Sequence, residues 1–174
     1  MIYLQTDRLI IRDNREDDLQ GLYELTIDEE NMRFMKSTKI NSYEEAIEHL
    51  KASIDESKKI DRKKYYFAII NKKTNEYIGA IGYDVLDNRN NERIVELGYF
   101  IKKEYWGNGF VVEAGKKVIN YAFYEDNVIK IEASCLKENN NSEKVMIKLG
   151  MKKEGELRKH QYHEGKWKDR LLYG

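Results

Sequence analysis

The sequence predicts a mixed α/β (α+β) domain with a central, mostly antiparallel sheet of about seven strands, flanking helices and a βαβ crossover. Three observations support this prediction. Short β-like runs alternate with segments whose apolar residues recur at helical spacing. Three β-like runs follow one another between residues 65 and 101, the first two joined by a polar turn. A helical segment then separates the runs at 94–101 and 129–136, as a crossover requires.

The first part of the chain predicts one strand and two helices. Residues 9–12 form a short β-like run, and Asn14 is expected to cap the helix that follows. That helix carries Leu19, Leu22, Tyr23 and Thr26 at helical spacing. Ser42 opens a capping box with Glu45. One face of the second helix then carries Tyr43, Ala46, Ile47, Leu50 and Ile54.

The rest of the chain continues the alternation. Residues 65–70 and 77–85 predict a hairpin, and 94–101 a third strand. The next helical stripe is made of Gly115, Val118, Ile119, Ala122 and Phe123. After the strand at 129–136, a further stripe contains Ser142, Val145, Met146 and Leu149, and Gly150 ends it. The tail predicts two strands around a turn at 163–166. Without a repeat or linker, residues 1–174 are expected to form one domain.

The composition argues against several classes of protein. The chain of 174 residues has 31 basic and 31 acidic residues, so it carries no electrostatic footprint for nucleic acid or an anionic membrane. Its apolar runs are too short to span a bilayer, and the first residues lack the apolar centre of a signal peptide. Cys135 is the single cysteine and cannot form an internal disulfide. We therefore expect a cytoplasmic enzyme or binding domain.

The stretch EYWGNGF at 104–110 places two glycines between a strand and a helix. It is no dinucleotide fingerprint, because Val112 stands where the third glycine is needed. It is no P-loop, because Lys117 stands where serine or threonine is required after Gly115-Lys116. A glycine turn before a helix still offers free amides and partial positive charge to a phosphate. The motif alone is equally consistent with phosphate binding and with a simple tight turn.

Four segments in order point to one family: TDRLIIR at 6–12, ELGYFI at 96–101, YWGNGFVVEA at 105–114 and ENNNSEKVMIKLGM at 138–151. Together they resemble the GNAT superfamily of acyl-CoA N-acyltransferases over nearly the whole chain. The likeness is closest to the branch of ribosomal-protein N-terminal acetyltransferases (RimJ/RimL-like). The resemblance implies acetyl-CoA as co-substrate, no metal, and direct transfer of the acetyl group to an amine in a ternary complex.

The resemblance also implies a cofactor site. The pyrophosphate of coenzyme A would lie against the backbone amides of Gly107, Asn108, Gly109, Phe110, Val111 and Val112. The backbone of Phe100 and Ile101 would pair with the pantetheine arm, and Asn139 would hydrogen-bond that arm. Val111 replaces the small residue of the family motif, so we expect its side chain to point into the core.

The candidate catalytic residues are Glu96 and Ser142. Attack on a thioester needs a neutral amine, and deprotonation at pH 7 costs roughly 4–5 kcal/mol for a lysine-like amine but about 1 kcal/mol for an α-amine. Glu96 is the first candidate for a water-linked base, on one strand face with Gly98, and Glu132 is the second. The alternative role of Glu96 is that of a solvated strand carboxylate or of an ion-pair partner for an arginine such as Arg93. Met146 stands where many relatives carry the tyrosine that protonates the thiolate. Ser142 is then the nearest hydroxyl that could relay a proton to the thiolate through water. Its alternative role is a simple hydrogen bond at the start of the helix.

Three hypotheses remain for the activity. The branch resemblance favours a protein or peptide N-terminal α-amine as acceptor. The alternative acceptor is a small amine, such as a polyamine or an aminoglycoside-like compound, which needs carboxylates such as those at 28–30, Asp84 and Asp87. The third hypothesis is a non-catalytic acyl-CoA-binding module. The chain is expected to be a monomer or homodimer.

Other residues fit simpler roles. His160 and His163 are three apart in a predicted strand and point to opposite faces, so we expect surface histidines and no metal site. Cys135 is expected to be a small core residue rather than a nucleophile. Tyr162 and Trp167 are consistent either with lining an acceptor groove or with packing on each other.

Overall fold

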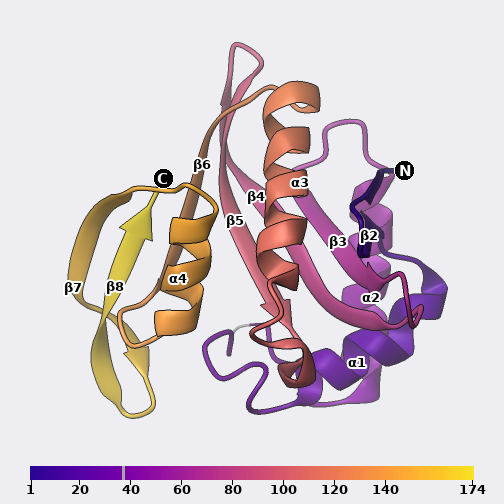
Figure 1. Ribbon diagram of the computed structural model, residues 1–174, viewed down its shortest axis with the longest axis horizontal. Helices are drawn as coiled ribbons and strands as arrows, with labels where there is room; N and C mark the ends of the chain where they lie inside the picture. The colour runs from indigo at the N-terminus through magenta and orange to yellow at the C-terminus, as the bar shows by residue number, and fades with distance from the viewer. Residues whose placement is uncertain (37) are drawn as a thin grey trace.

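The protein is described here by a computed structural model that covers residues 1–36 and 38–174. An open sheet of eight strands is flanked by helices (Figure 1). The strands are β1 (Tyr3–Gln5), β2 (Leu9–Asp13), β3 (Lys64–Asn71), β4 (Tyr77–Arg89), β5 (Glu92–Ile101), β6 (Val128–Leu136), β7 (Lys153–His163) and β8 (Lys166–Tyr173). The helices are α1 (Leu19–Ile27), α2 (Tyr43–Ser57), α3 (Phe110–Glu125) and α4 (Asn140–Lys148).

The strand order is β1-β2-β3-β4-β5-β6-β8-β7, and only the β5–β6 pair is parallel within the described ranges. The predicted fold class, with its α3 crossover between β5 and β6, is confirmed. The sheet has one strand more than the sequence predicts, because β1 is three residues long and shows no pattern of its own. A hydrogen bond from the Ile2 amide to Asp13 Oδ2 (2.6 Å) helps hold it against β2.

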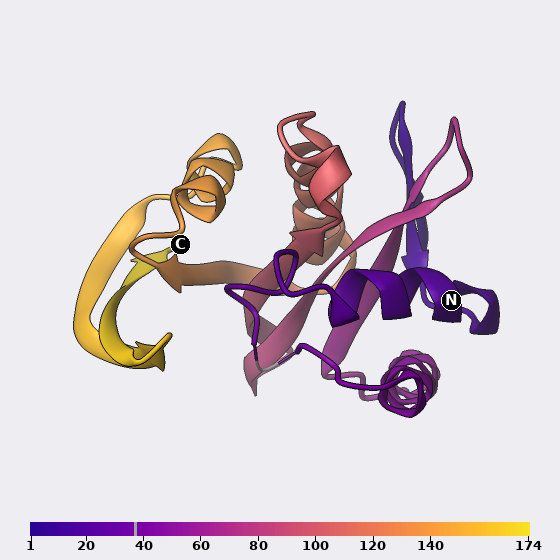
Figure 2. The ribbon, with the colours of Figure 1, turned by 90° about the horizontal axis from the view of Figure 1, so that it is seen from below.

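The helices cover both faces of the sheet, with α3 and α4 on one face and α1 and α2 on the other (Figure 2). The larger core cluster lies under α3 and α4 and includes Phe67, Val95, Val118 and Met146. The smaller one lies under α1 and α2 and includes Leu25, Leu50, Ala68 and Tyr77. In β5, Val95, Leu97 and Ile101 join the larger cluster and Phe100 packs against the smaller one. Alternation therefore puts Glu96, Gly98 and Phe100 on the α1–α2 face, as strand parity predicts.

Two predicted helix starts have different outcomes. Ser42 caps α2, since its side chain accepts a hydrogen bond from the Glu45 amide (3.2 Å), which confirms the prediction. The prediction that Asn14 caps the first helix is wrong. Asn14 is buried and donates to Ser53 Oγ (2.8 Å), and α1 begins only at Leu19, after a 3-10 turn at Glu16–Asp18. A contact with α2 has replaced the local cap. No helix in the described ranges has the length and apolar character needed to cross a membrane.

Candidate active site

The candidate site is a cleft that opens where β5 and β6 part. The two strands pair only from Arg93 to Glu96 and from Val128 to Glu132. Beyond these residues β6 pairs instead with β8, through Ala133–Leu136 (Figure 1). The cleft has a volume of about 580 Å³ and is lined by β5, β6, the start of α3 and the side of α4. A parallel pair that separates at mid-strand leaves backbone groups on both edges free for a ligand.

The glycine turn lies at one end of this cleft. Gly107 and Gly109 have positive φ angles of 76° and 77°, a conformation that glycine adopts without steric cost. Gly109 is the N-cap of α3, and its carbonyl accepts the first helical bond from the Glu113 amide (3.0 Å). The amides of residues 110–112 therefore have no helical partner and lie beside the cleft. Such a helix start offers donors and partial positive charge to a phosphate.

An ion pair fixes the turn from outside. Arg8 Nη2 lies 2.6 Å from Glu113 Oε2, and Arg8 Nη1 donates to the Asn108 carbonyl (3.1 Å). Burial alone would raise the pKa of Glu113, but hydrogen bonds from Thr6 and Arg8 outweigh burial and hold this pKa below its ordinary value. The TDR segment at 6–8 thus buttresses the glycine turn.

The predicted cofactor residues mostly line one cleft. Those at its surface are Phe100, Ile101, Gly107, Gly109, Phe110, Val111, Val112 and Asn139. Asn108 is outside this lining, and its side chain turns back to donate to the Trp106 carbonyl (3.0 Å). Val111 is half-buried and packs against the larger core cluster, so it points inward only in part.

The backbone of β5 offers a different pair of residues to the cleft than the sequence suggests. The Lys102 amide donates to the Ile78 carbonyl (2.8 Å), so Lys102 faces β4. Because antiparallel pairs alternate, the peptide groups of Phe100 also face β4, and those of Tyr99 and Ile101 face the cleft. The Ile101 carbonyl accepts a hydrogen bond from Trp106 Nε1 (2.9 Å). Phe100 therefore reaches the cleft through its side chain and not through its backbone.

Tyr99 and Ser142 bring two hydroxyl groups together across the cleft. The Tyr99 hydroxyl lies 3.0 Å from Ser142 Oγ and 3.1 Å from the Ser142 carbonyl. Burial raises the pKa of Tyr99 to about 12, although the bond to Ser142 opposes this rise. Asn139, which lines the cleft, caps α4 by accepting from the Ser142 amide (3.2 Å), and its NH2 group has no partner among the described residues. Met146 is fully buried in the core. Sequence reasoning missed Tyr99, although its parity, opposite to that of Glu96, already placed it on the other face of β5.

Glu96 and Glu132 occupy the point where the strands part, but their surroundings differ. Glu96 Oε1 accepts a hydrogen bond from Ser134 Oγ (2.8 Å), and Ser134 lines the cleft. Arg170 Nη2 lies 4.0 Å from the same oxygen. Glu132 pairs instead with Lys130 Nζ (2.9 Å). The cleft is thus linked to Glu96 and not to Glu132.

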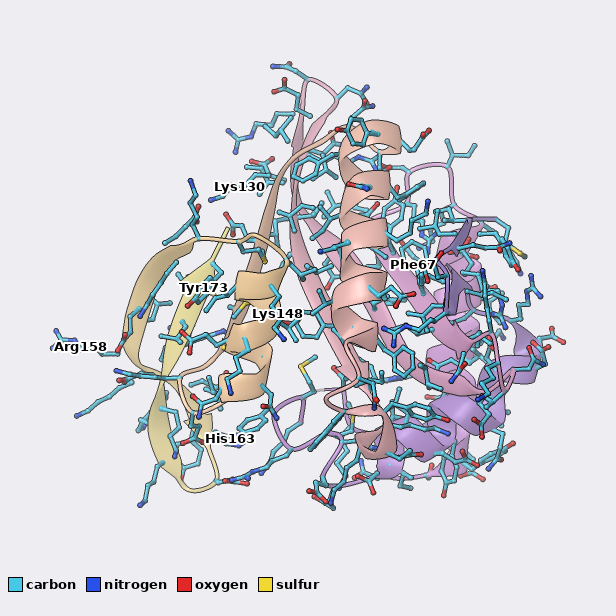
Figure 3. The ribbon with its side chains drawn as sticks, viewed as in Figure 1. Phe67, Lys130, Lys148, Arg158, His163 and Tyr173 are labelled. Carbon is cyan, nitrogen blue, oxygen red and sulfur yellow. The ribbon has the colours of Figure 1, made fainter. Side chains whose placement is uncertain are left out.

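The far end of the cleft is bounded by the loop after α1 and by the β7–β8 hairpin. Arg33 Nη2 lies 3.3 Å from Glu164 Oε2, and the Phe34 ring stacks on His163 at 5.7 Å. His163 lies at the hairpin end of β7, next to this loop (Figure 3). The prediction that His163 is a surface residue is therefore wrong, since the loop buries it, whereas His160 is exposed.

The remaining candidate residues supply no reactive group to the cleft. Tyr162 and Trp167 pack edge to face at 5.6 Å, and neither lines the cleft. Cys135 borders the cleft but is buried in the core cluster, as predicted. Burial raises the pKa of its thiol to about 11, so the thiolate needed of a nucleophile is scarce at neutral pH.

The mixed sheet that parts over a glycine turn and a helix start has the architecture of the acetyltransferase (GNAT) family. The model of the acetyltransferase (GNAT) domain matches residues 8–152, and the chain belongs to this family. It is 32% identical to the uncharacterized N-acetyltransferase YoaA of Bacillus subtilis over 98% of this chain and 94% of YoaA. It is 26% identical to the ribosomal protein uS5-alanine N-acetyltransferase of Escherichia coli over 98% of this chain and 89% of that enzyme. The chain is an N-acetyltransferase of the GNAT family.

Solved structures share the fold. A GNAT-family acetyltransferase from Bacillus anthracis superposes with a TM-score of 0.82 at 26% identity, over 99% of this chain and 96% of that one. RimL, an L7/L12 α-N-protein acetyltransferase solved with coenzyme A, has a TM-score of 0.87 at 16% identity, over 99% and 96%. The spermidine N-acetyltransferase of Vibrio cholerae, solved with CoA and spermine, has a TM-score of 0.82 at 20% identity, over 97% and 95%. At these last two identities the likeness concerns the fold alone.

Proposed function

We propose that the protein transfers an acetyl group from acetyl-CoA to the α-amine of a protein or peptide N-terminus. The observation that carries the cofactor assignment is the cradle formed by Gly107, Gly109 and the unpartnered amides at 110–112. These amides would bind the pyrophosphate, and Lys144 and Lys148, which line the cleft on α4, add positive charge. The peptide groups of Tyr99 and Ile101 would pair with the pantetheine arm, with Asn139 donating from the opposite side.

In this proposal Glu96 accepts the proton of the attacking amine through a water molecule. The Ser134 hydroxyl orients its carboxylate, and Gly98 leaves open space beside it, since a Cβ there would meet no atom within 4 Å among the described residues. Tyr99, paired with Ser142, protonates the departing thiolate. A phenol whose pKa is about 12 keeps its proton throughout the working range of pH.

The state of the carboxylates favours an α-amine over a polycation as acceptor. The carboxylates that would bind a polyamine or an aminoglycoside already have hydrogen-bond or ion-pair partners within the protein. Asp28 accepts from the Glu30 and Asn31 amides, Glu29 pairs with Lys39, Glu30 with Lys103, Asp84 accepts from the Tyr66 hydroxyl, and Asp87 pairs with Arg89. An α-amine also needs less of a base, because its deprotonation at pH 7 costs only about 1 kcal/mol.

Incubation with acetyl-CoA and a panel of amines, with released thiol as the readout, tests this function. We expect turnover with peptides that begin with alanine or serine and little with spermine. Turnover with spermine alone would support the small-amine alternative. Thermal stabilisation by acetyl-CoA without turnover on any amine would support a binding module.

A further inference from the structure

We propose that Arg170 determines the acceptor, because its guanidinium recognises the first carbonyl oxygen of a peptide that presents its α-amine to Glu96. This inference rests on the proposed function and adds a residue that selects between the two acceptor classes. Arg170 lies on β8, at the wall of the cleft opposite β5, with its side chain 28% exposed.

The surroundings of Arg170 hold its guanidinium in a fixed orientation. Nε and Nη2 donate to Ser134 Oγ (3.0 and 2.7 Å), and Nη1 donates to Gln161 Oε1. A guanidinium has five N–H groups. Three are used in these contacts, so among the described residues one N–H on Nη1 and one on Nη2 remain for a ligand. The planar fork is therefore preorganised rather than free to rotate.

The geometry matches one chemical pattern in the acceptor. Nη2 of Arg170 and Oε1 of Glu96 are 4.0 Å apart and both contact Ser134 Oγ, so a base and a hydrogen-bond donor lie side by side. In a peptide N-terminus the amine and the first carbonyl are separated by a single carbon. An amine held near Glu96 through one water molecule thus brings that oxygen to the side of Arg170. A polyamine has no such oxygen, and the guanidinium repels its second ammonium group.

The test compares two acceptors that differ only in this carbonyl. One is a short alanyl peptide, and the other is a primary monoamine of similar size without a carbonyl. Removing a charge-assisted hydrogen bond in Arg170→Gln should lower kcat/KM for the peptide about 10- to 100-fold, mainly through KM. For the plain monoamine the change should stay within about threefold, and spermine should become a better substrate.

Two controls separate recognition from folding. Arg158→Gln removes the same charge from the outer side of β7, where the side chain points away from the cleft, and should leave both acceptors unchanged (Figure 3). Stabilisation by coenzyme A should be equal in wild type and Arg170→Gln. If Arg170→Gln does not fold, Arg170→Lys keeps the charge without the fork and should show the same bias against the peptide.

The outcomes distinguish this inference from the function on which it rests. Equal losses for peptide and monoamine would mean that Arg170 only positions Glu96, and an unchanged KM for the peptide would mean that it does not contact the acceptor. Either result overturns the role of Arg170 while the proposed function stands. A wild-type enzyme that acetylates spermine and no peptide would overturn both.

Discussion

The guanidinium of Arg8 lies 2.6 Å from the carboxylate of Glu113, which joins the segment before β2 to the first turn of α3. The Thr6 hydroxyl donates to the same carboxylate (2.5 Å). Through its bond to the Asn108 carbonyl, Arg8 also reaches the glycine turn itself. The conformation of the proposed phosphate site is therefore supported by residues from the beginning of the chain.

Substitution of Arg8 should weaken cofactor binding without unfolding the protein. Arg8→Gln removes the bond to the Asn108 carbonyl and the ion pair with Glu113, so the turn loses its external support. We expect the Kd for coenzyme A, measured by calorimetry, to rise about 5- to 20-fold, which corresponds to one or two hydrogen bonds. Arg89→Gln removes an exposed arginine far from the turn and is the matched control. An unchanged Kd in Arg8→Gln would show that the turn keeps its shape unaided.

The same ion pair predicts a pH dependence of stability. Because the pKa of Glu113 in the folded protein lies below its ordinary value of 4.5, the ionised carboxylate stabilises the fold at pH values above 4.5. That contribution is lost as the pH falls through the lowered pKa. The difference in Tm between wild type and Glu113→Gln should be constant from about pH 7 to 5 and should narrow below about 4.5. A difference that widens in acid would contradict this assignment.

The sequence was sufficient wherever a local pattern decides the structure. Ser42 caps α2 because its partner is three residues away, and alternation alone places Glu96 and Gly98 on one face of β5. Asn14 has the residue type of a cap, yet it bonds Ser53 on α2, a contact that no local pattern contains.

The site was predictable in its backbone and less so in its side chains. The glycine turn follows from the motif and the family resemblance. The partner of Ser142, in contrast, depends on how α4 lies over β5, which brings the Tyr99 hydroxyl to it. His163 is buried by Phe34 from a loop far away in the chain. Such contacts depend on tertiary packing, and spacing along the chain cannot supply them.

A charge placed in the glycine turn should abolish cofactor binding. Gly109→Asp puts a carboxylate beside the amides that would hold the pyrophosphate, so acetyl-CoA should no longer raise the Tm. Gly109→Asn is the matched control, because asparagine tolerates positive φ and has nearly the same shape without the charge. We expect it to keep part of the thermal shift. A folded Gly109→Asp variant with the full shift would place the phosphate site elsewhere.

The Tyr99–Ser142 pair predicts unequal effects of removing the two hydroxyl groups. Tyr99→Phe should lower kcat at pH 7 about 10- to 100-fold. This loss lies at the low end of the rate effects that general acid catalysis usually contributes. Ser142→Ala should cost less, because the Tyr99 hydroxyl is still held by the Ser142 carbonyl. Above about pH 8.5, where a free thiol ionises on its own, the Tyr99→Phe defect should shrink. A larger loss in Ser142→Ala would instead assign the proton to Ser142.

The assignment of the base to Glu96 can be tested by a nearly isosteric change. Glu96→Gln keeps an oxygen that accepts from Ser134, so the strand and the coenzyme A affinity should be preserved. Turnover on an alanyl peptide at pH 7 should fall about 10²- to 10⁴-fold, the usual cost of losing a general base. Glu132→Gln removes the neighbouring carboxylate, which pairs with Lys130, and should leave turnover nearly unchanged.

The pH profile of the Glu96→Gln variant then reports on the acceptor. With an α-amine the defect should shrink as the pH rises through about 8, because the solution itself supplies the neutral amine. With a polyamine the defect should persist to higher pH, since those amines stay protonated. Wild-type turnover of Glu96→Gln at pH 7 would remove Glu96 from the mechanism. If Glu132 is then the base, Glu132→Gln would show the loss of turnover instead. If the acceptor arrives already neutral, neither variant would be impaired.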